Sequence, residues 1–225
     1  MIIVTGASKG LGRAICERLL KKKFEVLGLS RNVKGIPFSS YSCDVSSYEQ
    51  VKKIANKLKS KKKKISGLIN AAGIASMNLA LTTPANISQN IINTNLLGTI
   101  YTCQLFSPLM IRNKYGSIIN FSTIAVSLGL KGESIYSASK AGVENFTRSF
   151  AKEVSYFNIN VNCIAPGPIK TNLLKGITKE QIKNIISKQI IVKQFAPEDI
   201  CNLVEILLDS RSNSLSGQIL HVGGV

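Results

Sequence analysis

Histidine and tryptophan are almost missing from the 225-residue sequence, which has one histidine, His221, and no tryptophan. A Ser-His-Asp triad needs a histidine as its general base. His221 falls in the last predicted strand and the order of motifs gives it no partner, so we interpret it as a structural residue. The sequence therefore argues against hydrolysis by a serine nucleophile.

Cysteine is also sparse, and its spacing excludes two further classes of protein. The cysteines are odd in number, lie far apart and form no Cys-x-x-Cys pair. This pattern is typical neither of a disulfide-stabilised domain nor of a zinc protein, so no metal site is predicted. Each cysteine is expected to be a small buried apolar residue; the five are Cys16, Cys43, Cys103, Cys163 and Cys201.

Acidic residues are few, 12 against 29 lysines and arginines, which gives a formal net charge of +17. Such a field attracts nucleic acid, anionic membranes and acidic proteins. The one dense run, Lys59 with Lys61–Lys64, follows a helical pattern and is interpreted as a solvated helix end, where lysines complement the helix dipole. We expect no nucleic-acid or membrane partner, and a preference for an anionic substrate or protein is the alternative that the charge leaves open.

Long hydrophobic runs are absent as well. No run reaches the roughly 20 residues of a membrane helix, and the opening Met-Ile-Ile-Val-Thr-Gly lacks the basic region of a secretion signal. We therefore expect a cytoplasmic location. The length and the 44% of hydrophobic residues suit one hydrophobic core, so a single domain is predicted over residues 1–225.

Short β-rich runs alternate with longer segments of helical period along the whole chain. The alternation is typical of βαβ units, and continuous apolar strands indicate a parallel sheet covered on both faces. The predicted fold class is α/β, a Rossmann-type doubly wound parallel sheet of about seven strands in three layers, α/β/α. Strands are predicted at 2–5, 24–29, 41–43, 67–70, 117–121, 160–164 and 218–221, and helices at 11–22, 47–58, 87–112, 134–157, 178–188 and 197–208. The less regular region 172–195 follows a strand end, where a substrate lid would lie.

A glycine-rich turn, Thr5-Gly6-Ala7-Ser8-Lys9-Gly10-Leu11-Gly12, links the first predicted strand to the first helix. Glycines let the backbone turn tightly and approach a pyrophosphate, and the free N–H groups of a helix start favour an anion. The turn matches neither G-x-G-x-x-G nor the Walker A pattern, so its position at the head of a βαβ unit carries the prediction of a dinucleotide site. A purely structural turn is the alternative.

The end of the second strand, Leu29-Ser30-Arg31-Asn32, indicates which dinucleotide is expected. An NAD-binding chain typically presents a carboxylate there to the ribose 2′-hydroxyl. Here the planar guanidinium of Arg31 could bind a 2′-phosphate, with help from Lys9. We therefore predict NADPH or NADP+ as the cofactor, and an ordinary surface role for Arg31 is the alternative.

Tyr136-Ser137-Ala138-Ser139-Lys140 places a phenol and an ammonium four residues apart on one face of a predicted helix. A nearby cation favours the phenolate and so lowers the tyrosine pKa from about 10. Lowering it by about three units requires roughly 4 kcal/mol, so Lys140 would need help from cofactor charge or from desolvation. The tyrosine could then protonate a carbonyl near neutral pH.

Together these motifs resemble the short-chain dehydrogenase/reductase family over nearly the whole chain. Thr5 to Gly12 is similar to its glycine motif, Asn70-Ala71-Ala72-Gly73 resembles its Asn-Asn-Ala-Gly segment, and Tyr136 to Lys140 matches Tyr-x-x-x-Lys. The resemblance implies a nicotinamide-dependent oxidoreductase, with Asp44-Val45 at the adenine and Pro166 to Thr171 at the nicotinamide carboxamide. The cofactor-binding residues implied are Gly6, Ser8, Lys9, Gly10, Leu11, Gly12, Arg31, Asp44, Val45, Asn70, Ala71, Gly73, Tyr136, Lys140, Pro166, Gly167, Ile169 and Thr171.

The resemblance also implies catalytic roles. Tyr136 would be the general acid, and Lys140 would hold the ribose while lowering the tyrosine pKa. Asn95 would hold a water that links Lys140 to a proton relay, or else it is a buried helix residue that satisfies backbone groups. The family's carbonyl-polarising serine usually lies thirteen residues before the tyrosine, where this chain has Thr123. Threonine offers the same hydroxyl donor, so we assign the role to Thr123 and keep Ser122 as the alternative.

Within the family the chain looks most like the 3-oxoacyl-(acyl-carrier-protein) reductases of fatty acid biosynthesis. This likeness implies a 3-oxoacyl thioester substrate carried on an acidic acyl carrier protein, and a homotetramer or dimer. Lys114 falls near one basic docking position of such reductases, whereas Phe157 occupies a second one and is not basic. The alternatives are another small ketone, a sugar or a polyol as substrate and, more remotely, a catalytically idle dinucleotide-binding scaffold.

Overall fold

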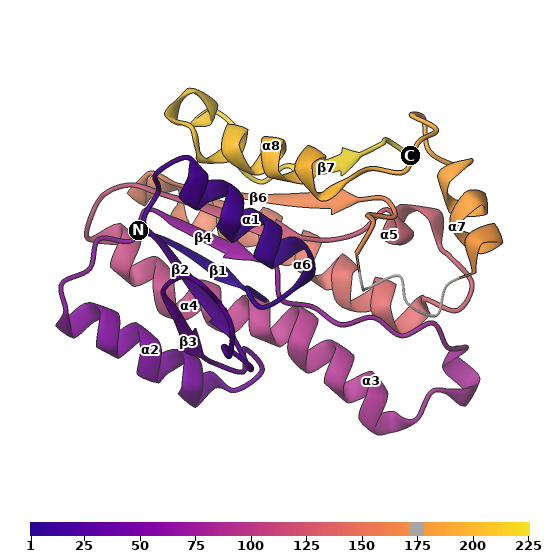
Figure 1. Cartoon of the computed structure of the whole chain (residues 1–225), viewed down its shortest axis with the longest axis horizontal. Helices are drawn as coiled ribbons and strands as arrows, with labels where there is room; N and C mark the ends of the chain where they lie inside the picture. Colours follow the sequence, from indigo (N-terminus) through magenta and orange to yellow (C-terminus); the bar gives the residue numbers. More distant parts are fainter. Residues whose placement is uncertain (172–177) are drawn as a thin grey trace.

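A computed structural model of the chain describes residues 1–171 and 178–225. In this part of the chain, seven parallel strands form one sheet with the order β3-β2-β1-β4-β5-β6-β7 (Figure 1). The predicted doubly wound parallel sheet is thereby confirmed. The strands are β1 (Ile2–Thr5), β2 (Val26–Ser30), β3 (Ser40–Ser42), β4 (Gly67–Asn70), β5 (Gly116–Phe121), β6 (Ile159–Pro166) and β7 (Ile219–Val222).

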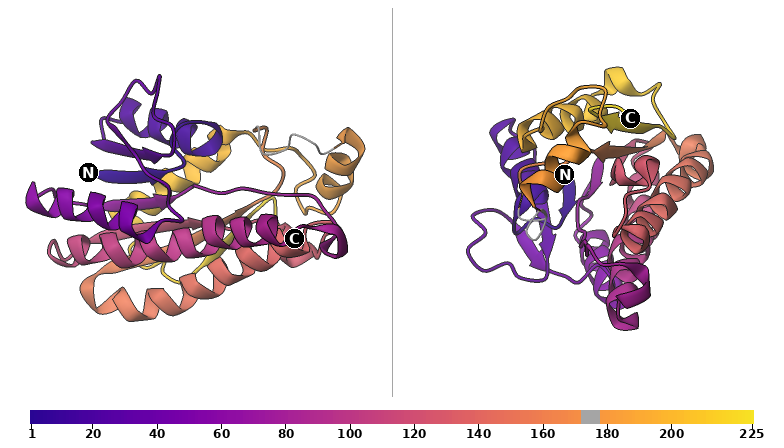
Figure 2. Two further views of the ribbon diagram at one scale, coloured as in Figure 1. Left: turned by 90° about the horizontal axis from the view of Figure 1, so that it is seen from below. Right: turned by 90° about the vertical axis from the view of Figure 1, so that its right-hand side faces the viewer.

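Helices cover both faces of the sheet and make the three layers that are visible in Figure 2. Helices α1 and α8 lie on one face, and α2, α4 and α6 lie on the other. The helices are α1 (Gly10–Lys21), α2 (Tyr48–Ser60), α3 (Ala85–Ile92), α4 (Gly98–Ile111), α5 (Ala125–Leu128), α6 (Ser134–Val154), α7 (Lys179–Ile186) and α8 (Pro197–Leu208).

Two hydrophobic clusters, one on each face, hold the layers together. Successive side chains of a strand point to opposite faces of a sheet. Accordingly Ile3 packs with α2, α4 and α6, whereas Ile2 and Val4 pack with α1 and α8. All three side chains are fully buried, which explains why β1 is a continuous apolar run and not an alternating one.

Three details differ from the sequence prediction. The second strand begins at Val26 because the chain leaves α1 through Lys23, whose φ of 65° is left-handed, and the Phe24 N–H still bonds to the Leu19 carbonyl. The helix predicted over 87–112 contains a π-helical turn, Asn93–Leu97, between α3 and α4. The four-residue helix α5 is too short to show a periodic pattern and was not predicted.

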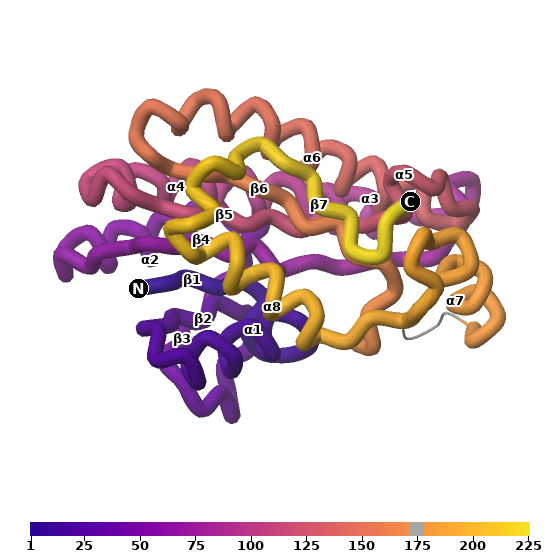
Figure 3. Tube along the Cα trace, turned by 90° about the horizontal axis from the view of Figure 1, so that it is seen from above, coloured from indigo at the N-terminus to yellow at the C-terminus, as the bar shows by residue number. Residues whose placement is uncertain are grey.

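The region 172–195, predicted as a substrate lid, is described from residue 178 onward, while 172–177 lie outside the described residues. Its described part contains α7, and the chain after this helix is tied to the C-terminus by a 2.8 Å hydrogen bond from the Ile191 N–H to the Gly223 carbonyl. Figure 3 shows α7 beside the C-terminus, at the end of the molecule opposite the N-terminus.

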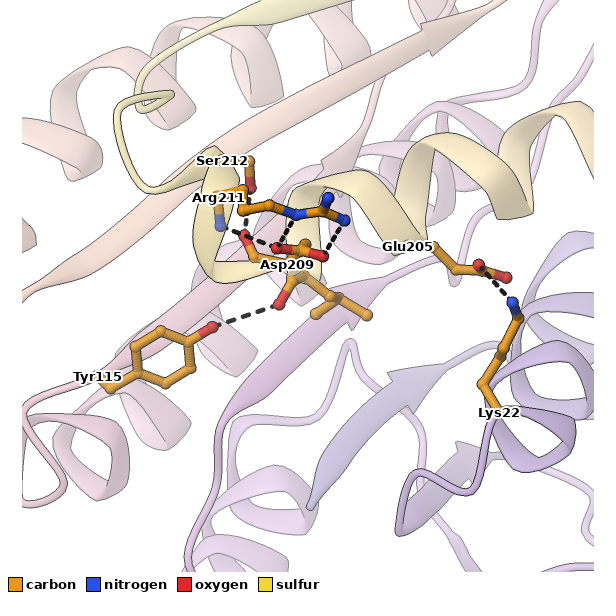
Figure 4. A network of polar contacts seen from close by, with 7 residues as sticks. Lys22, Tyr115, Glu205, Asp209, Arg211 and Ser212 are labelled. Atoms are coloured by element: carbon orange, nitrogen blue, oxygen red, sulfur yellow. Dashed lines mark hydrogen bonds and ion pairs between the residues drawn. The ribbon is translucent and has the colours of Figure 1, made fainter.

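Helix α8 is held by burial more than by its surface ion pairs. Glu205 pairs with Arg18. It also pairs with Lys22, at the end of α1, at 3.5 Å, and the Tyr115 hydroxyl donates to the Leu208 carbonyl at 3.3 Å (Figure 4). Pairs of this exposure contribute only about 0–1 kcal/mol each. The apolar side chains that α8 buries against the sheet therefore dominate its docking; they are Ile200, Cys201, Val204 and Leu207.

The strand order marks the edge of the sheet where a binding crevice is expected. The chain runs outward from β1 to β3 and then crosses to β4 on the other side of β1, so the order reverses between β1 and β4. Ligands of open α/β sheets bind outside the carboxyl ends of the strands at such a point.

The five cysteines are buried, as predicted, and none of the described helices is long and apolar enough to cross a membrane.

Candidate active site

The glycine turn after β1 lies directly against the segment that follows β4. Gly6 has a φ of +69°, and a Cβ there would lie 2.9 Å from the Ala71 carbonyl oxygen. A Cβ at Gly12 would lie 2.5 Å from the Gly6 carbonyl oxygen, so both positions require glycine. Thr5 Oγ1 accepts a 3.0 Å hydrogen bond from the Ala72 N–H. Closely packed backbone therefore forms the floor of the crevice.

The start of α1 is suited to an anion. In the described part of the chain, Lys9 makes no side-chain capping hydrogen bond and the first turn contains no acidic residue. The N–H groups of an uncapped helix start attract phosphate, so this cradle fits the pyrophosphate of a dinucleotide. A Cβ at Gly10 would lie 3.9 Å from Thr171 Cβ, which brings the segment after β6 up to the glycine turn. Leu11 packs into the cluster on the α1 face and fixes the turn.

Arg31 follows β2 and is exposed beside this turn. The Ser30 hydroxyl donates to Ser8 Oγ at 2.8 Å, and the Ser42 hydroxyl donates to the Arg31 carbonyl at 3.0 Å. These two contacts join the ends of β2 and β3 to the turn. Lys9 is exposed as well, so two cations flank the end of β2.

Asp44 and Val45 follow β3, and both side chains already have structural contacts. Asp44 Oδ1 accepts hydrogen bonds from the Ser46 N–H at 3.0 Å and from its hydroxyl at 2.7 Å. Val45 is buried, and a Cβ at Gly98 would lie 2.8 Å from its Cγ2. The pair forms one wall of the crevice, and its contact with adenine stays a prediction.

Asn70 ends β4, but its side chain is turned into the core. Its amide donates to Asn120 Oδ1 at 2.9 Å, its Oδ1 accepts from the Thr102 hydroxyl at 2.7 Å, and Asn120 in turn donates to Thr147 Oγ1 at 2.9 Å. This buried chain ties β4 and β5 to α4 and α6. Asn70 can therefore contact a dinucleotide only through its main chain. The same holds for Ala71 and Gly73, which follow Asn70.

Asn95 lies in the π-helical turn and is fully buried. Its side chain accepts from the Ile74 N–H and donates to the Ile74 carbonyl, both at 2.9 Å, and it also donates to Ser139 Oγ at 3.0 Å. The backbone-satisfying role considered for Asn95 is thus seen directly in its contacts. A π-helical turn often marks a functional site, and the water-holding role stays a prediction.

Lys140 reaches the crevice from α6. Its amine donates to the Phe121 carbonyl at 2.8 Å, and a Cβ at Gly73 would lie 3.6 Å from Nζ. The side chain is only 4% exposed, and this burial lowers the lysine pKa from 10.5 to about 8, with a small opposing effect from Cys163. The amine is therefore mostly charged at neutral pH and close to its titration range.

Tyr136 lies on the same helix, four residues before Lys140, and is buried. Burial raises the pKa of its phenol, the carboxyl group of Glu133 raises it further, and a hydrogen bond with the Thr123 side chain lowers it. Glu133 is itself buried, which raises the pKa of its carboxyl group. In the unliganded protein the phenol thus keeps its proton.

Thr123 and Ser122 point to different neighbours. The Thr123 side chain is close enough to Tyr136 to lower the phenol pKa, and its Oγ1 accepts from the Ala125 N–H at 3.3 Å. The Ser122 hydroxyl instead donates to Glu144 Oε1 at 2.6 Å in a buried contact. The geometry therefore favours Thr123 as the hydroxyl that faces a substrate carbonyl. His221 lies on β7 and has Ser127 Oγ 3.1 Å from its Nε2, away from these groups.

The segment after β6 closes the crevice on its far side. The Gly167 N–H donates to the Val222 carbonyl at 3.3 Å, and the Pro166 carbonyl accepts from the Ile124 N–H at 3.1 Å. Ile169 is buried and bridges to Phe195 in parallel register. The predicted cofactor and catalytic residues therefore gather at the carboxyl edge of β1, β2, β4, β5 and β6.

The sequence reasoning missed two residues with defined places in this site. Ser139 links Asn95 to α6 and donates to the Tyr136 carbonyl at 2.6 Å. Its place beside Lys140 in the Tyr-Ser-Ala-Ser-Lys run was the only available signal. Glu144 had no signal, because nothing in the sequence pairs it with Ser122.

Comparison with known proteins shows strong relatives over the whole chain. A family model described as short chain dehydrogenase matches residues 1–182. The 3-oxoacyl-[acyl-carrier-protein] reductase FabG of Buchnera aphidicola is 33% identical, covering 99% of this chain and 95% of the relative. Carbonyl reductase family member 4 of Xenopus laevis is 34% identical, covering 98% and 95%.

Solved structures agree in fold and differ in the cofactor they hold. ElxO with NADP bound has 30% identity and a TM-score of 0.90, covering 98% of this chain and 96% of ElxO. A 4-hydroxyisoleucine dehydrogenase mutant complexed with NADH and succinate has 26% identity and a TM-score of 0.92, covering 99% and 97%.

The buried amine predicts a pH-dependent stability difference between the wild type and Lys140→Met, both without cofactor. Between about pH 8 and 10.5 the unfolded lysine holds a proton that the folded one has lost, so the contribution of Lys140 to the free energy of unfolding rises with pH. Relative to the variant, the gain approaches about 1.4 kcal/mol per pH unit at most. Urea unfolding at pH 7, 8, 9 and 9.5 measures it. A difference in the free energy of unfolding between the two proteins that stays constant over this pH range would contradict the lowered pKa.

Proposed function

We propose that this chain, which belongs to the short chain dehydrogenase family, is an NADPH-dependent reductase. Members of this family are oxidoreductases acting on alcohol and carbonyl groups. The proposed reaction converts a carbonyl, preferably that of a 3-oxoacyl thioester, to a secondary alcohol. One observation carries the proposal. Tyr136 lies beside Thr123, whose side chain lowers the phenol pKa, and four residues before the buried Lys140 amine, at the sheet edge that also carries the glycine turn.

The protein's own groups supply the proton and the electrostatics of the reaction. Tyr136 holds its proton in the unliganded site and donates it to the carbonyl oxygen, while the Thr123 hydroxyl donates a hydrogen bond to the same oxygen. The nicotinamide of bound NADPH supplies the hydride. In the unliganded site the Thr123 side chain, and not Lys140, lowers the phenol pKa. The ammonium of Lys140 favours the phenolate that proton transfer leaves on Tyr136, because an opposite charge nearby stabilises the ionised form.

The choice of NADPH rests on charge at the end of β2. Arg31 and Lys9 are both exposed there, and a guanidinium binds a phosphate group with two parallel hydrogen bonds. The relative solved with NADP bound, at 30% identity, is consistent with this choice. With NADH, the ribose 2′-hydroxyl would leave Arg31 without an anionic partner.

The choice of substrate rests on relatives and on charge. Relatives named as 3-oxoacyl-[acyl-carrier-protein] reductases, at 33% identity, favour a 3-oxoacyl thioester. The net charge of +17 suits an acidic carrier, and we propose such a carrier and a homo-oligomeric assembly as partners. Lys114 and Phe157, the two carrier-docking positions considered above, precede β5 and β6, at the sheet edge opposite the crevice. A carrier protein that brings its substrate to the crevice of this same chain therefore does not need Lys114 or Phe157 for docking.

A small free carbonyl compound is the second candidate substrate. The 34% identity to carbonyl reductase family member 4 favours it, because that name describes reduction of carbonyls without a stated carrier. Both candidates need the same proton donor and differ only in the pocket that holds the rest of the substrate. Within the predicted lid, Leu173, Leu174, Ile177 and Ile182 favour an acyl or other apolar substrate, and packing of the lid on its own domain is the equal alternative. The first three of these residues lie outside the described residues.

A substrate screen tests the proposal directly. NADPH depletion is followed with a 3-oxoacyl thioester, small diketones and keto-sugars, and the expected result is the highest kcat/KM for the 3-oxoacyl thioester. Tyr136→Phe is the control, because it removes the acidic proton and keeps the ring, so its turnover should fall at least about 100-fold. An unmutated protein that oxidises NADPH with none of these compounds would overturn the proposal and favour the idle scaffold.

Cofactor choice is predicted to follow Arg31. In Arg31→Asp, repulsion of the 2′-phosphate should lower the ratio of kcat/KM for NADPH to that for NADH by about tenfold or more, since charged hydrogen bonds contribute about 1.5–3 kcal/mol. Lys34→Asp, a charge change of the same size at an exposed position in the same loop, should leave the ratio within about twofold. An unchanged ratio in Arg31→Asp would return Arg31 to an ordinary surface role.

The hydroxyl at Thr123 is predicted to polarise the carbonyl. Thr123→Val, which keeps the shape and removes the donor, should lower kcat by about 100-fold, as the loss of an oxyanion donor does. Thr123→Ser restores the hydroxyl and should keep kcat within about threefold of the wild type. If Thr123→Val keeps full turnover while Ser122→Ala loses it, the role belongs to Ser122.

A further inference from the structure

Two hydrogen bonds side by side join the end of β5 to α6. The Lys140 amine donates to the Phe121 carbonyl at 2.8 Å, and the Ser122 hydroxyl donates to Glu144 Oε1 at 2.6 Å. Phe121 is the last residue of β5 and Ser122 follows it, and Lys140 and Glu144 are one turn apart on the helix. The next residue, Thr123, is close enough to Tyr136 of the same helix to lower its phenol pKa.

Glu144 is an unusual residue for this place because it is almost closed to solvent. Glu144 is 7% exposed and Ser122 is 4% exposed. A buried carboxylate is costly unless its oxygens are hydrogen-bonded or paired. Oε1 has the Ser122 hydroxyl, and Oε2 lies 3.8 Å from the guanidinium of Arg148, whose side chain is 52% exposed. The inner oxygen thus holds the strand, and the outer one faces a cation at the surface.

The two bonds differ in what happens to them during turnover. Lys140 lies beside Gly73 at the crevice, and under the proposed function its amine also binds the dinucleotide there. The Ser122–Glu144 bond is buried between strand and helix and needs no change when the crevice fills. It can therefore hold the end of β5 while the Lys140 amine changes partners.

We propose that Glu144 is a positioning residue: through Ser122 it holds the end of β5 against α6 and so keeps the Thr123 hydroxyl in place beside Tyr136. This inference rests on the proposed function. It follows from the order of contacts at the end of β5: Phe121 and Ser122 bond to successive turns of α6, and Thr123, the next residue, lies beside Tyr136 of the preceding turn. A shift of about 1 Å in a reacting group can cost about 100-fold in rate, so a small movement of Thr123 is sufficient to slow the reaction.

The test compares Glu144→Leu, Glu144→Gln, Ser122→Ala and Arg148→Ala with the wild type. Glu144→Leu and Ser122→Ala should lower kcat by about tenfold and leave the Kd for NADPH within about twofold, because the bond lies behind the reacting hydroxyl and not at the cofactor. Glu144→Gln keeps an oxygen acceptor for Ser122 and should stay within about threefold of wild-type kcat. Arg148→Ala touches only the outer oxygen and should match the wild type.

Amide hydrogen exchange without cofactor gives a second readout that does not need turnover. The Ser122 N–H bonds to the Ile164 carbonyl at 2.8 Å, and the Ile124 N–H bonds to the Pro166 carbonyl at 3.1 Å. If Glu144 holds this segment, exchange at residues 122 and 124 should be about tenfold faster in Glu144→Leu and Ser122→Ala and unchanged in Arg148→Ala.

The outcomes separate the inference from the proposed function. Any of three results would overturn the positioning role. These are a wild-type kcat in both Ser122→Ala and Glu144→Leu, a loss of NADPH binding as large as the loss of kcat, and unchanged hydrogen exchange at residues 122 and 124. If Glu144→Leu does not fold, Ser122→Ala decides, since it removes a single hydroxyl. A wild type that reduces no carbonyl defeats the proposed function, and hydrogen exchange then decides the role of Glu144.

Discussion

The Lys140 amine lies in a position that is nearly closed to water, where it donates a 2.8 Å hydrogen bond to the carbonyl of Phe121. An ammonium in such surroundings is costly, and the cost appears as a pKa lowered to about 8. Several features of the site are arranged around this charge. Asn95 and Gly73 lie beside it, Tyr136 precedes it on the helix, and the Phe121 carbonyl accepts its hydrogen bond.

The parallel sheet makes this arrangement possible. Its strands end at one edge, so residues from 5 to 171 that are far apart in sequence meet there. Most follow the end of a strand, whereas Asn95, Tyr136 and Lys140 reach the same edge from helical turns. The core below is apolar on both faces and carries the stability, as the buried Ile2, Ile3 and Val4 of β1 show. The edge can therefore keep groups that cost stability, such as a buried lysine and a buried glutamate, because the layers beneath them do not depend on those groups.

Much of this was predictable from the sequence because it depends on local patterns. Apolar runs fixed the strands, and the glycine turn and the Tyr136–Lys140 spacing each depend on a few neighbouring residues. The π-helical turn at Asn95 was not predictable, since it differs from an α-helix by one hydrogen-bond register and leaves the apolar period unchanged. The Ser122–Glu144 bond was not predictable either, because it joins residues 22 apart through tertiary packing. The left-handed Lys23 was missed because glycine is the usual residue at such a helix end.

The measurement that tests the account most directly is the proton balance of cofactor binding. Calorimetric titration of the wild type with NADPH at pH 8, in buffers of different ionisation enthalpy, measures how many protons the complex takes up. An amine with a pKa of about 8 that becomes fully charged beside the dinucleotide should take up about half a proton, and Lys140→Met should take up none. Binding of NADPH without proton uptake by the wild type, or with equal uptake by Lys140→Met, would contradict the central role given to this charge.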